Sequence, residues 1–352
     1  MPRTTQPPVI RISGTIDDRR QMTEQEETHM VHAKDKKILT RLYTYACHED
    51  EAELCGLELR TLFRKRTEAG IAAFVADPGT PAVGVSRSPF LKRRLDAAFR
   101  SETLEGLIEE LDGYDLSGQT FKVYFTDGDE RHTYKEKREL ERRVGANLTG
   151  TADMRSPQRR FGLARFKGEW LFGPCEDNDA TWLSHQAKPQ NYSTALPTRA
   201  ARALVNIAAG SETRGVRLVD PCCGMGTVLI EALSMGIDTE GFEINPLAVR
   251  GARANLAHFG YSGQAVTKGD MLQLQAPQRY DAAILDMPYN LCSVLPSEEQ
   301  LAMLRSLRRM ADRAVVVTTE NIVNQLVSSD FRVVDGAKLS KGTFKRFISV
   351  VE

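Results

Sequence analysis

The chain has 352 residues, of which 41% are hydrophobic and 27% are charged, with 47 basic and 47 acidic side chains. These values are ordinary for a globular protein, and the length is comfortable for two domains. The balanced charge argues against a non-specific nucleic-acid binder, the lack of any run of 18 uncharged apolar residues argues against a membrane span, and the polar N-terminus argues against a secretory signal.

The first half of the chain mixes strand and helix patterns. Residues 1–36 lack aromatic side chains and are expected to form a disordered extension, and residues 37–178 are expected to form an α+β region. The apolar patterns predict strands at 38–47, 71–77 and 121–127, helices at 48–63, 88–100 and 133–148, and a hairpin over 161–173. The helix at 88–100 would have Ser88 as its N-cap and Pro89 in its first turn.

Residues 179–352 alternate regularly between helix and strand patterns, which indicates a parallel sheet with crossover helices. Helices are predicted at 197–210, 227–236, 246–259 and 298–311, the last with Ser297 and Gln300 as a capping box. Strands are predicted at 216–220, 239–244, 264–270, 280–286 and 313–319, followed by an antiparallel pair at 331–340 and 344–352. This order predicts an α/β fold with a seven-stranded mixed sheet.

A glycine-rich loop joins the first strand of the second half to the helix that follows it. The loop reads DPCCGMGT over residues 220–227, and Gly224 and Gly226 leave room for a ligand close to the backbone. Dinucleotide-binding enzymes use a similar turn, but they need a third glycine where this chain has Leu229. Asp220 at the strand end suits the ammonium group of S-adenosylmethionine and would repel a pyrophosphate. The loop therefore favours S-adenosylmethionine over a nicotinamide or flavin cofactor.

Two further carboxylates end strands of the same sheet. Glu243 stands at the end of the second strand, where it can accept both ribose hydroxyls of an adenosine. Asp270 ends the third strand, where it can accept from the adenine amino group while the backbone of Met271 contacts the ring. Ligands of open α/β sheets bind at the carboxyl ends of the strands, so these acids are expected to converge on one crevice. The predicted cofactor-binding residues are Asp220, Cys222, Gly224, Gly226, Glu243, Asp270 and Met271.

The segment Asp286-Met287-Pro288-Tyr289, at the end of the fourth strand, sets the expected chemistry. An exocyclic amine of a nucleobase is a poor nucleophile because its lone pair is delocalised into the ring. When Asp286 and a backbone carbonyl accept its N–H bonds, the lone pair is directed toward the methyl donor, and Tyr289 can stack on an extruded base. We therefore predict Asp286, Pro288 and Tyr289 as catalytic residues and Met287 and Asn290 as substrate contacts.

These segments together resemble the THUMP-containing RNA guanine-N2-methyltransferases, in particular their bacterial branch. The resemblance rests on residues 220–227, on GFEINP at 241–246, on DMPYNLCSV at 286–294 and on KPQNYSTALPTRAARALVNIA at 188–208. It reaches the first half at 43–51, 86–94 and 141–173, the last of which resembles the end of a THUMP domain. The family usually has a proline at the position of Met287, but Pro288 still restricts the preceding residue to extended backbone angles.

The resemblance implies a Rossmann-like class I methyltransferase domain over 179–352, preceded by a THUMP-like RNA-binding region over 37–178. It also implies S-adenosylmethionine as the cofactor, tRNA as the partner, and methylation of the exocyclic N2 of a guanosine by direct in-line transfer. A cytoplasmic location fits the six cysteines, which have no CxxC spacing. We expect no metal and no membrane partner, and the sequence does not indicate an oligomeric state.

Two alternatives stay open at this point. The exocyclic N6 amine of adenine is an equally poor nucleophile, so an adenine-N6 methyltransferase acting on rRNA or DNA would carry the same motif. A non-catalytic nucleic-acid-binding module would retain a cofactor-like pocket, although the intact set of acids argues against it. Cys292 follows the motif closely, but we interpret it as a packing residue and not as a nucleophile.

Overall fold

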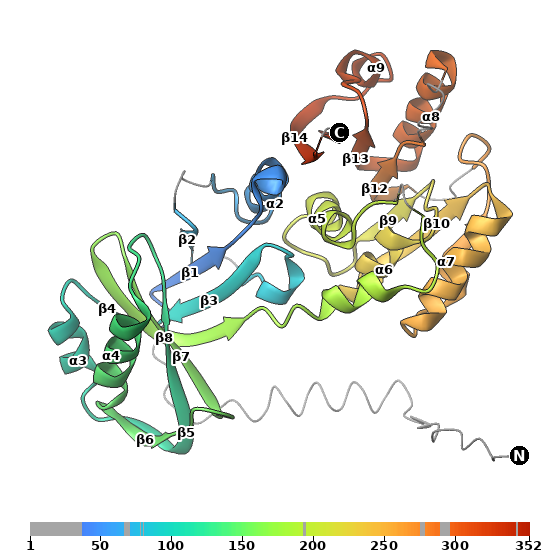
Figure 1. The fold of residues 1–352 in the computed structure, drawn as a ribbon. Coiled ribbons are helices and arrows are strands. Elements are labelled where there is room, and N and C mark those ends of the chain that lie inside the picture. The colour runs from blue at the N-terminus through green and yellow to red at the C-terminus, as the bar shows by residue number, and fades with distance from the viewer. Residues whose placement is uncertain are drawn as a thin grey trace, which may run out of the picture.

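The structure is a computed structural model that describes residues 37–66, 71–77, 79, 81–192, 195–274, 279–288, 296–342 and 344–352. The extension predicted over 1–36 lies outside the described residues, as do Tyr289, Asn290 and Cys292. Two β-sheets stand out among the described residues, and they are built from the first and the second half of the chain (Figure 1).

The first sheet has the strand order β2-β1-β3-β8-β7-β5-β6, with β4 paired to β8. Its strands are β1 (Thr40–Tyr45), β2 (Ala73–Ala76), β3 (Leu91–Ala97), β4 (Phe99–Ser101), β5 (Tyr114–Thr126), β6 (Leu148–Ala152), β7 (Arg159–Phe166) and β8 (Glu169–Asp177). Helices α3 (Leu104–Leu111) and α4 (Tyr134–Gly145) pack over a core that includes Phe161 and Phe172. The predicted hairpin at 161–173 is confirmed as β7 and β8.

The helix predicted over 88–100 is wrong, because these residues form β3 and β4. Leu91 and Leu95 are buried while the residues between them are more exposed, which fits the alternation of a strand. Strand β3 pairs with β1 on one side and with β8 on the other. Ser88 accepts a hydrogen bond from the N–H of Leu91, as a cap would, yet it also donates to the buried Glu58. Non-local strand pairing therefore outweighs the local helix signals.

The second sheet has the strand order β11-β10-β9-β12-β13-β15-β14, and β15 runs antiparallel to both of its neighbours. Its strands are β9 (Arg217–Asp220), β10 (Asp238–Glu243), β11 (Val266–Lys268), β12 (Tyr280–Asp286), β13 (Ala311–Thr318), β14 (Val333–Lys341) and β15 (Phe344–Val351). The predicted seven-stranded mixed sheet of a class I methyltransferase fold is confirmed.

Helices cover both faces of this second sheet. They are α5 (Thr198–Ala209), α6 (Thr227–Ser234), α7 (Pro246–His258), α8 (Ser297–Met310) and α9 (Val323–Val327). One core cluster contains residues of α5 and α6, and another contains residues of α8 and α9. The predicted capping box of α8 is wrong: the N-cap is Pro296, so Ser297 already lies inside the helix and makes no capping bond.

The two halves share one hydrophobic core. Helix α2 (Ala52–Phe63) packs against α5 and β14 (Figure 1), and Leu57 of α2 belongs to the same buried cluster as Leu204 of α5. At the centre of this boundary the fully buried Glu58 accepts from the Ser88 hydroxyl at 2.5 Å and from the Asn206 side chain at 2.6 Å. Burial raises the pKa of Glu58 to about 7, against the opposing effect of these hydrogen bonds.

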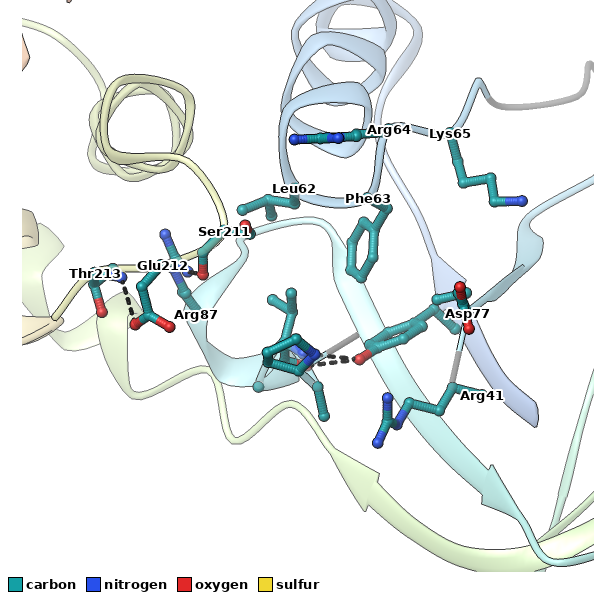
Figure 2. A pocket seen from close by; sticks show the side chains of 16 residues that line it. Arg41, Leu62, Phe63, Arg64, Lys65, Asp77, Arg87, Ser211, Glu212 and Thr213 are labelled. Atoms are coloured by element: carbon teal, nitrogen blue, oxygen red, sulfur yellow. Dashed lines mark hydrogen bonds between the residues drawn. The ribbon is translucent and has the colours of Figure 1, made fainter. Parts of the chain in front are cut away.

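A cavity of about 580 Å³ lies on this boundary, beside the loop that precedes β9 and therefore at the amino ends of the parallel strands. Figure 2 shows Phe63 and Arg64 on its α2 side and Glu212 on the opposite side. One of its three arginines, Arg87, already has partners, because it donates to the Asn206 side chain at 2.8 Å and to the Ser211 carbonyl. This end of the sheet lies away from the strand ends that carry the predicted acids.

Candidate active site

The glycine loop connects β9 to α6 at the carboxyl end of the second sheet. Gly224 and Gly226 have φ angles of +52° and +76°, in the left-handed region that favours glycine. A Cβ atom on Gly224 would have no described atom within 4 Å, whereas one on Gly226 would lie 3.3 Å from the Cβ of Ala252 in α7. Gly224 thus leaves open space for a ligand, and Gly226 permits close packing on α7.

Close packing between α6 and the sheet depends on a glycine in the neighbouring strand. A Cβ atom on Gly241 of β10 would lie 2.4 Å from Cδ1 of Leu229 and 3.0 Å from Cβ of Cys223. Dinucleotide-binding proteins obtain this close approach with a glycine in the helix. Here the helix supplies Leu229 and the strand supplies the glycine, so the loop is built differently from a dinucleotide fingerprint.

Two of the predicted cofactor carboxylates hold the loop through backbone N–H groups. Asp220 is 3% exposed and accepts from the N–H of Cys222 at 3.2 Å. Glu243, at the end of β10, accepts from the N–H of Gly224 at 3.0 Å and from the N–H of Asn245 at 2.8 Å. Glu243 therefore joins the end of β10 directly to the glycine loop.

The third predicted carboxylate, Asp270, follows β11. It accepts from the N–H of Leu272 at 2.9 Å. The neighbouring Met271 is buried, and its sulfur lies 3.5 Å from the Cys222 thiol. Its carbonyl accepts from the Ser306 hydroxyl of α8 at 2.7 Å. These contacts hold the end of β11 against the glycine loop.

The predicted acids lie close enough to one another to act on the same thiol. Burial raises the pKa of the Cys222 thiol, and the negative charges of four carboxylates raise it further: Asp220, Glu243, Asp286 and Asp270. Burial also raises the pKa of Asp220 well above its usual value, and Asp286 and Glu243 add to this effect. Grouped carboxylates in a buried place favour a positively charged ligand. S-adenosylmethionine carries a sulfonium and an ammonium group, so the residues present fit this cofactor.

Asp286 ends β12 on the sheet face that α5 covers, since Ile284 two residues earlier lies in that core. Its Oδ1 atom is buried and has no hydrogen-bond partner among the described residues. Burial raises the pKa of Asp286 to about 7, and the positive charge of Arg346 opposes this rise. A buried acceptor without a partner is costly unless a ligand satisfies it.

Met287 stands where the resembled family usually has a proline, and in the structure it makes a backbone hydrogen bond. Its N–H donates to the carbonyl of Val317 in β13 at 2.9 Å, a bond that proline cannot make. Its side chain is buried in the core beneath α8, and Pro288 is exposed. Tyr289, predicted as a catalytic residue, and Asn290, predicted as a substrate contact, lie outside the described residues.

Asn255 of α7 is a site residue that the sequence analysis missed. It is fully buried, and its side-chain amide donates to the carbonyls of Met225 and Gln190, both at 2.9 Å. Its oxygen accepts from the N–H of Gln190 at 2.8 Å. Asn255 therefore ties the segment before α5 to the glycine loop. The sequence feature that could have identified Asn255 is its position as a polar residue on the buried face of the predicted helix at 246–259.

Within the described ranges, no group of three or more His, Cys, Asp and Glu side chains is arranged to hold a metal ion. In the same part of the chain, no helix is long and apolar enough to cross a membrane.

Comparison with known proteins agrees with this geometry. Residues 185–333 match the family model for the UPF0020 RMKL-like methyltransferase domain. The chain is 27% identical over 292 residues to the tRNA (guanine(10)-N2)-dimethyltransferase of Methanothermobacter thermautotrophicus, covering 73% of this chain and 80% of that protein. It is 34% identical over 127 residues to the protein of the same name from Pyrococcus abyssi, covering 35% of this chain and 37% of that protein.

Among solved structures, TrmN from Thermus thermophilus matches with a TM-score of 0.43 at 18% identity, covering 89% of this chain and 99% of that one. The non-catalytic alternative is set aside by the family match together with the strand-end acids. Together with the strand-end acids, this match shows that the chain is an S-adenosylmethionine-dependent methyltransferase.

Proposed function

We propose that this chain methylates the exocyclic N2 of a guanosine in tRNA by direct in-line transfer, without a covalent enzyme intermediate. The observation that carries the proposal is Asp286, whose buried Oδ1 lacks a partner among the described residues at the strand end beside the predicted cofactor acids. The names of the two tRNA (guanine(10)-N2)-dimethyltransferase relatives support guanosine in tRNA as the target.

The cofactor roles follow the strand ends. S-adenosylmethionine supplies an electrophilic methyl group when it is bound. We assign Asp220 to its ammonium group, Glu243 to its ribose hydroxyls and Asp270 to its adenine amine. The backbone of Met271, together with Cys222, Gly224 and Gly226, would form the rest of the binding surface. The open space above Gly224 supports this assignment.

The ionised form of Asp286 suits guanine. Guanine presents N1–H and N2–H donors side by side, and a carboxylate offers only acceptors. Adenine presents its N6–H beside the N1 lone pair, so a carboxylate meets one donor there and two on guanine. Asp286 would accept one N–H of the guanine amine, and the carbonyl of Met287 would accept the other N–H of the same amine. With a pKa of about 7, Asp286 can also take the proton that the amine loses on methylation.

We propose that the substrate side includes Pro288 as a shaping residue, Tyr289 as a stacking residue, and Asn290 as a contact. We also propose residues 37–178 as a THUMP-like RNA-binding region, residues 179–352 as the methyltransferase domain, and a cytoplasmic site of action. The separate eight-stranded and seven-stranded sheets support this division.

Basic side chains on the first sheet support the contact with RNA. Lys122, Arg160 and Arg93 lie over the ring of Tyr124, at 4.6, 4.7 and 5.1 Å from its centroid. Arg93 and Arg160 both pair with Asp177, so two of the three cations share one carboxylate. An excess of positive charge beside an aromatic ring suits RNA phosphates and bases.

The test is nucleoside mass spectrometry of purified tRNA and rRNA from a strain that lacks the gene. We expect N2-methylguanosine or its dimethylated form to disappear from tRNA and to return when the wild-type gene is restored. Loss of N6-methyladenosine, with the guanosine products unchanged, would establish the adenine alternative instead.

A further inference from the structure

A second cavity on the boundary between the halves lies at the carboxyl edge of the second sheet. It has a volume of about 520 Å³, within the range of roughly 300–1,000 Å³ that is usual for ligand pockets. Three segments line it: the short turn that precedes α2, the first turn of α5, and the hairpin of β14 and β15. Both halves of the chain therefore contribute to its walls.

Arg346 connects this cavity to Asp286. It lines the cavity from β15, is 6% exposed, and its charge acts on Asp286. The sheet ladder pairs Asp286 with Val317 and Val317 with Ile348. Ile348 lies two residues after Arg346 and in the same core cluster as Ile284, so Arg346 and Asp286 are on the same face of the sheet. Arg346 therefore lines the cavity and lies on the same side of the sheet as the proposed catalytic carboxylate.

The walls of the cavity combine flat surfaces with hydrogen-bond donors. The guanidinium of Arg346 lies 4.8 Å from the centroid of the Phe344 ring. Arg199 of α5, which also lines the cavity, pairs with Glu51 at 3.2 Å. RNA-binding proteins stack unpaired bases on aromatic rings and on arginine planes, and arginine also donates to base acceptors. These walls suit a nucleobase better than an aliphatic chain or a bare anion.

We propose that this cavity receives the purine nucleotide extruded from the RNA, with its base against Phe344 and Arg346 and its exocyclic amine at Asp286. This inference rests on the proposed function and adds the pocket that holds the target. Because Glu51 comes from the first half and Arg346 from the second, the pocket forms only when the two halves are packed together. RNA bound by the first half would then place its target nucleotide in this cavity.

Arg346 also acts through Asp286, and in this respect it is a positioning residue. Asp286 interacts with the acid Asp220 and the thiol Cys222 on the glycine loop side and with Arg346 on the β15 side. Among these described groups, Arg346 favours the ionised form of Asp286. Removing it should shift the pH dependence of methyl transfer toward alkaline pH, which a purely structural role would not do.

The test compares Arg346→Met with Lys345→Met in the full-length chain. Lys345 is the adjacent residue in β15 and is exposed on the opposite face, so both variants lose one positive charge. Binding of the single-stranded oligonucleotide UUGUU, with UUAUU as the comparison, is measured by calorimetry in the presence of S-adenosylhomocysteine. We expect Arg346→Met to weaken UUGUU binding roughly ten- to hundredfold. Lys345→Met should bind like the wild type, and only Arg346→Met should show the alkaline shift.

A second variant, Phe344→Leu, keeps an apolar side chain and removes the stacking ring. It should weaken UUGUU binding without moving the pH profile, and it keeps the inference testable if Arg346→Met does not fold. Wild-type binding by Phe344→Leu and by any folded Arg346→Met would overturn the cavity assignment. A failure of the proposed function looks different: the RNA product would carry its methyl group on a base other than guanine, while both variants still lost oligonucleotide binding.

Discussion

The proposed cofactor side and the proposed substrate side of the site are built from different parts of the chain. Asp220, Glu243 and Asp270 follow three strands of the second sheet and meet around one loop of the same half. The cavity lined by Arg346, in contrast, has walls from the turn before α2, from α5 and from the final hairpin. Cofactor binding should therefore depend on the second half alone, whereas substrate binding should depend on how the two halves pack.

The largest expected effect is the loss of catalysis without a loss of cofactor binding in Asp286→Ala. We expect methyl transfer to tRNA to fall roughly a hundred- to ten-thousandfold, because no carboxylate remains to accept from the target amine. Affinity for S-adenosylhomocysteine, measured by calorimetry, should stay nearly unchanged. Asp238→Ala, at the exposed start of β10, is the control and should keep full activity. Near-normal methylation by Asp286→Ala would remove the catalytic assignment.

The converse effect is expected for Asp220→Asn. Its side chain can no longer pair with a positively charged ligand, so affinity for S-adenosylmethionine should fall roughly ten- to hundredfold. Turnover at saturating cofactor should fall much less. The two sides of the site would not be separable if Asp220→Asn and Asp286→Ala changed cofactor affinity and turnover in the same proportion.

A smaller effect is expected from pH. Burial raises the pKa of Asp286 to about 7, and the ionised form is the one that accepts from the amine. The value of kcat/KM for tRNA should therefore rise as the pH rises through about 7 and then level off. Rates measured across this range in one buffer system at constant ionic strength test the expectation. A flat profile would show that the titration of Asp286 does not limit the reaction.

The last prediction concerns the stability of the fold at the boundary between the halves, and no change in activity is expected from it. The pKa of Glu58 is raised to about 7 from 4.5, so the folded chain favours its protonated form. The resulting stabilisation is present below about pH 4.5 and is lost as the pH rises through 7, and its size is on the order of 3 kcal/mol. The free energy of unfolding, measured with urea at several pH values, should depend less on pH in Glu58→Gln. The control Glu109→Gln, at an exposed position, should keep the wild-type dependence. An unchanged pH dependence in Glu58→Gln would contradict the assignment.

The grouping of the proposed cofactor acids could be predicted from the sequence because Asp220 and Glu243 end strands and Asp270 follows one, close to a loop with two glycines. The substrate side could not, since Glu51 and Arg346 come together only through packing between the halves. The strand at Leu91–Ala97 was predicted as a helix because its partners, β1 and β8, lie far away in the chain. Asn255 was missed because its bonds reach the backbone of two distant loops. The roles of Tyr289 and Asn290 stay predictions.

The central claim is that Asp286 directs methyl transfer to guanine N2. The most direct measurement is nucleoside mass spectrometry of an unmodified tRNA transcript after incubation with S-adenosylmethionine and either the purified chain or its Asp286→Ala variant. We predict N2-methylguanosine with the wild-type chain and none above background with the variant. N6-methyladenosine as the wild-type product, or equal amounts of N2-methylguanosine from both proteins, would contradict the claim.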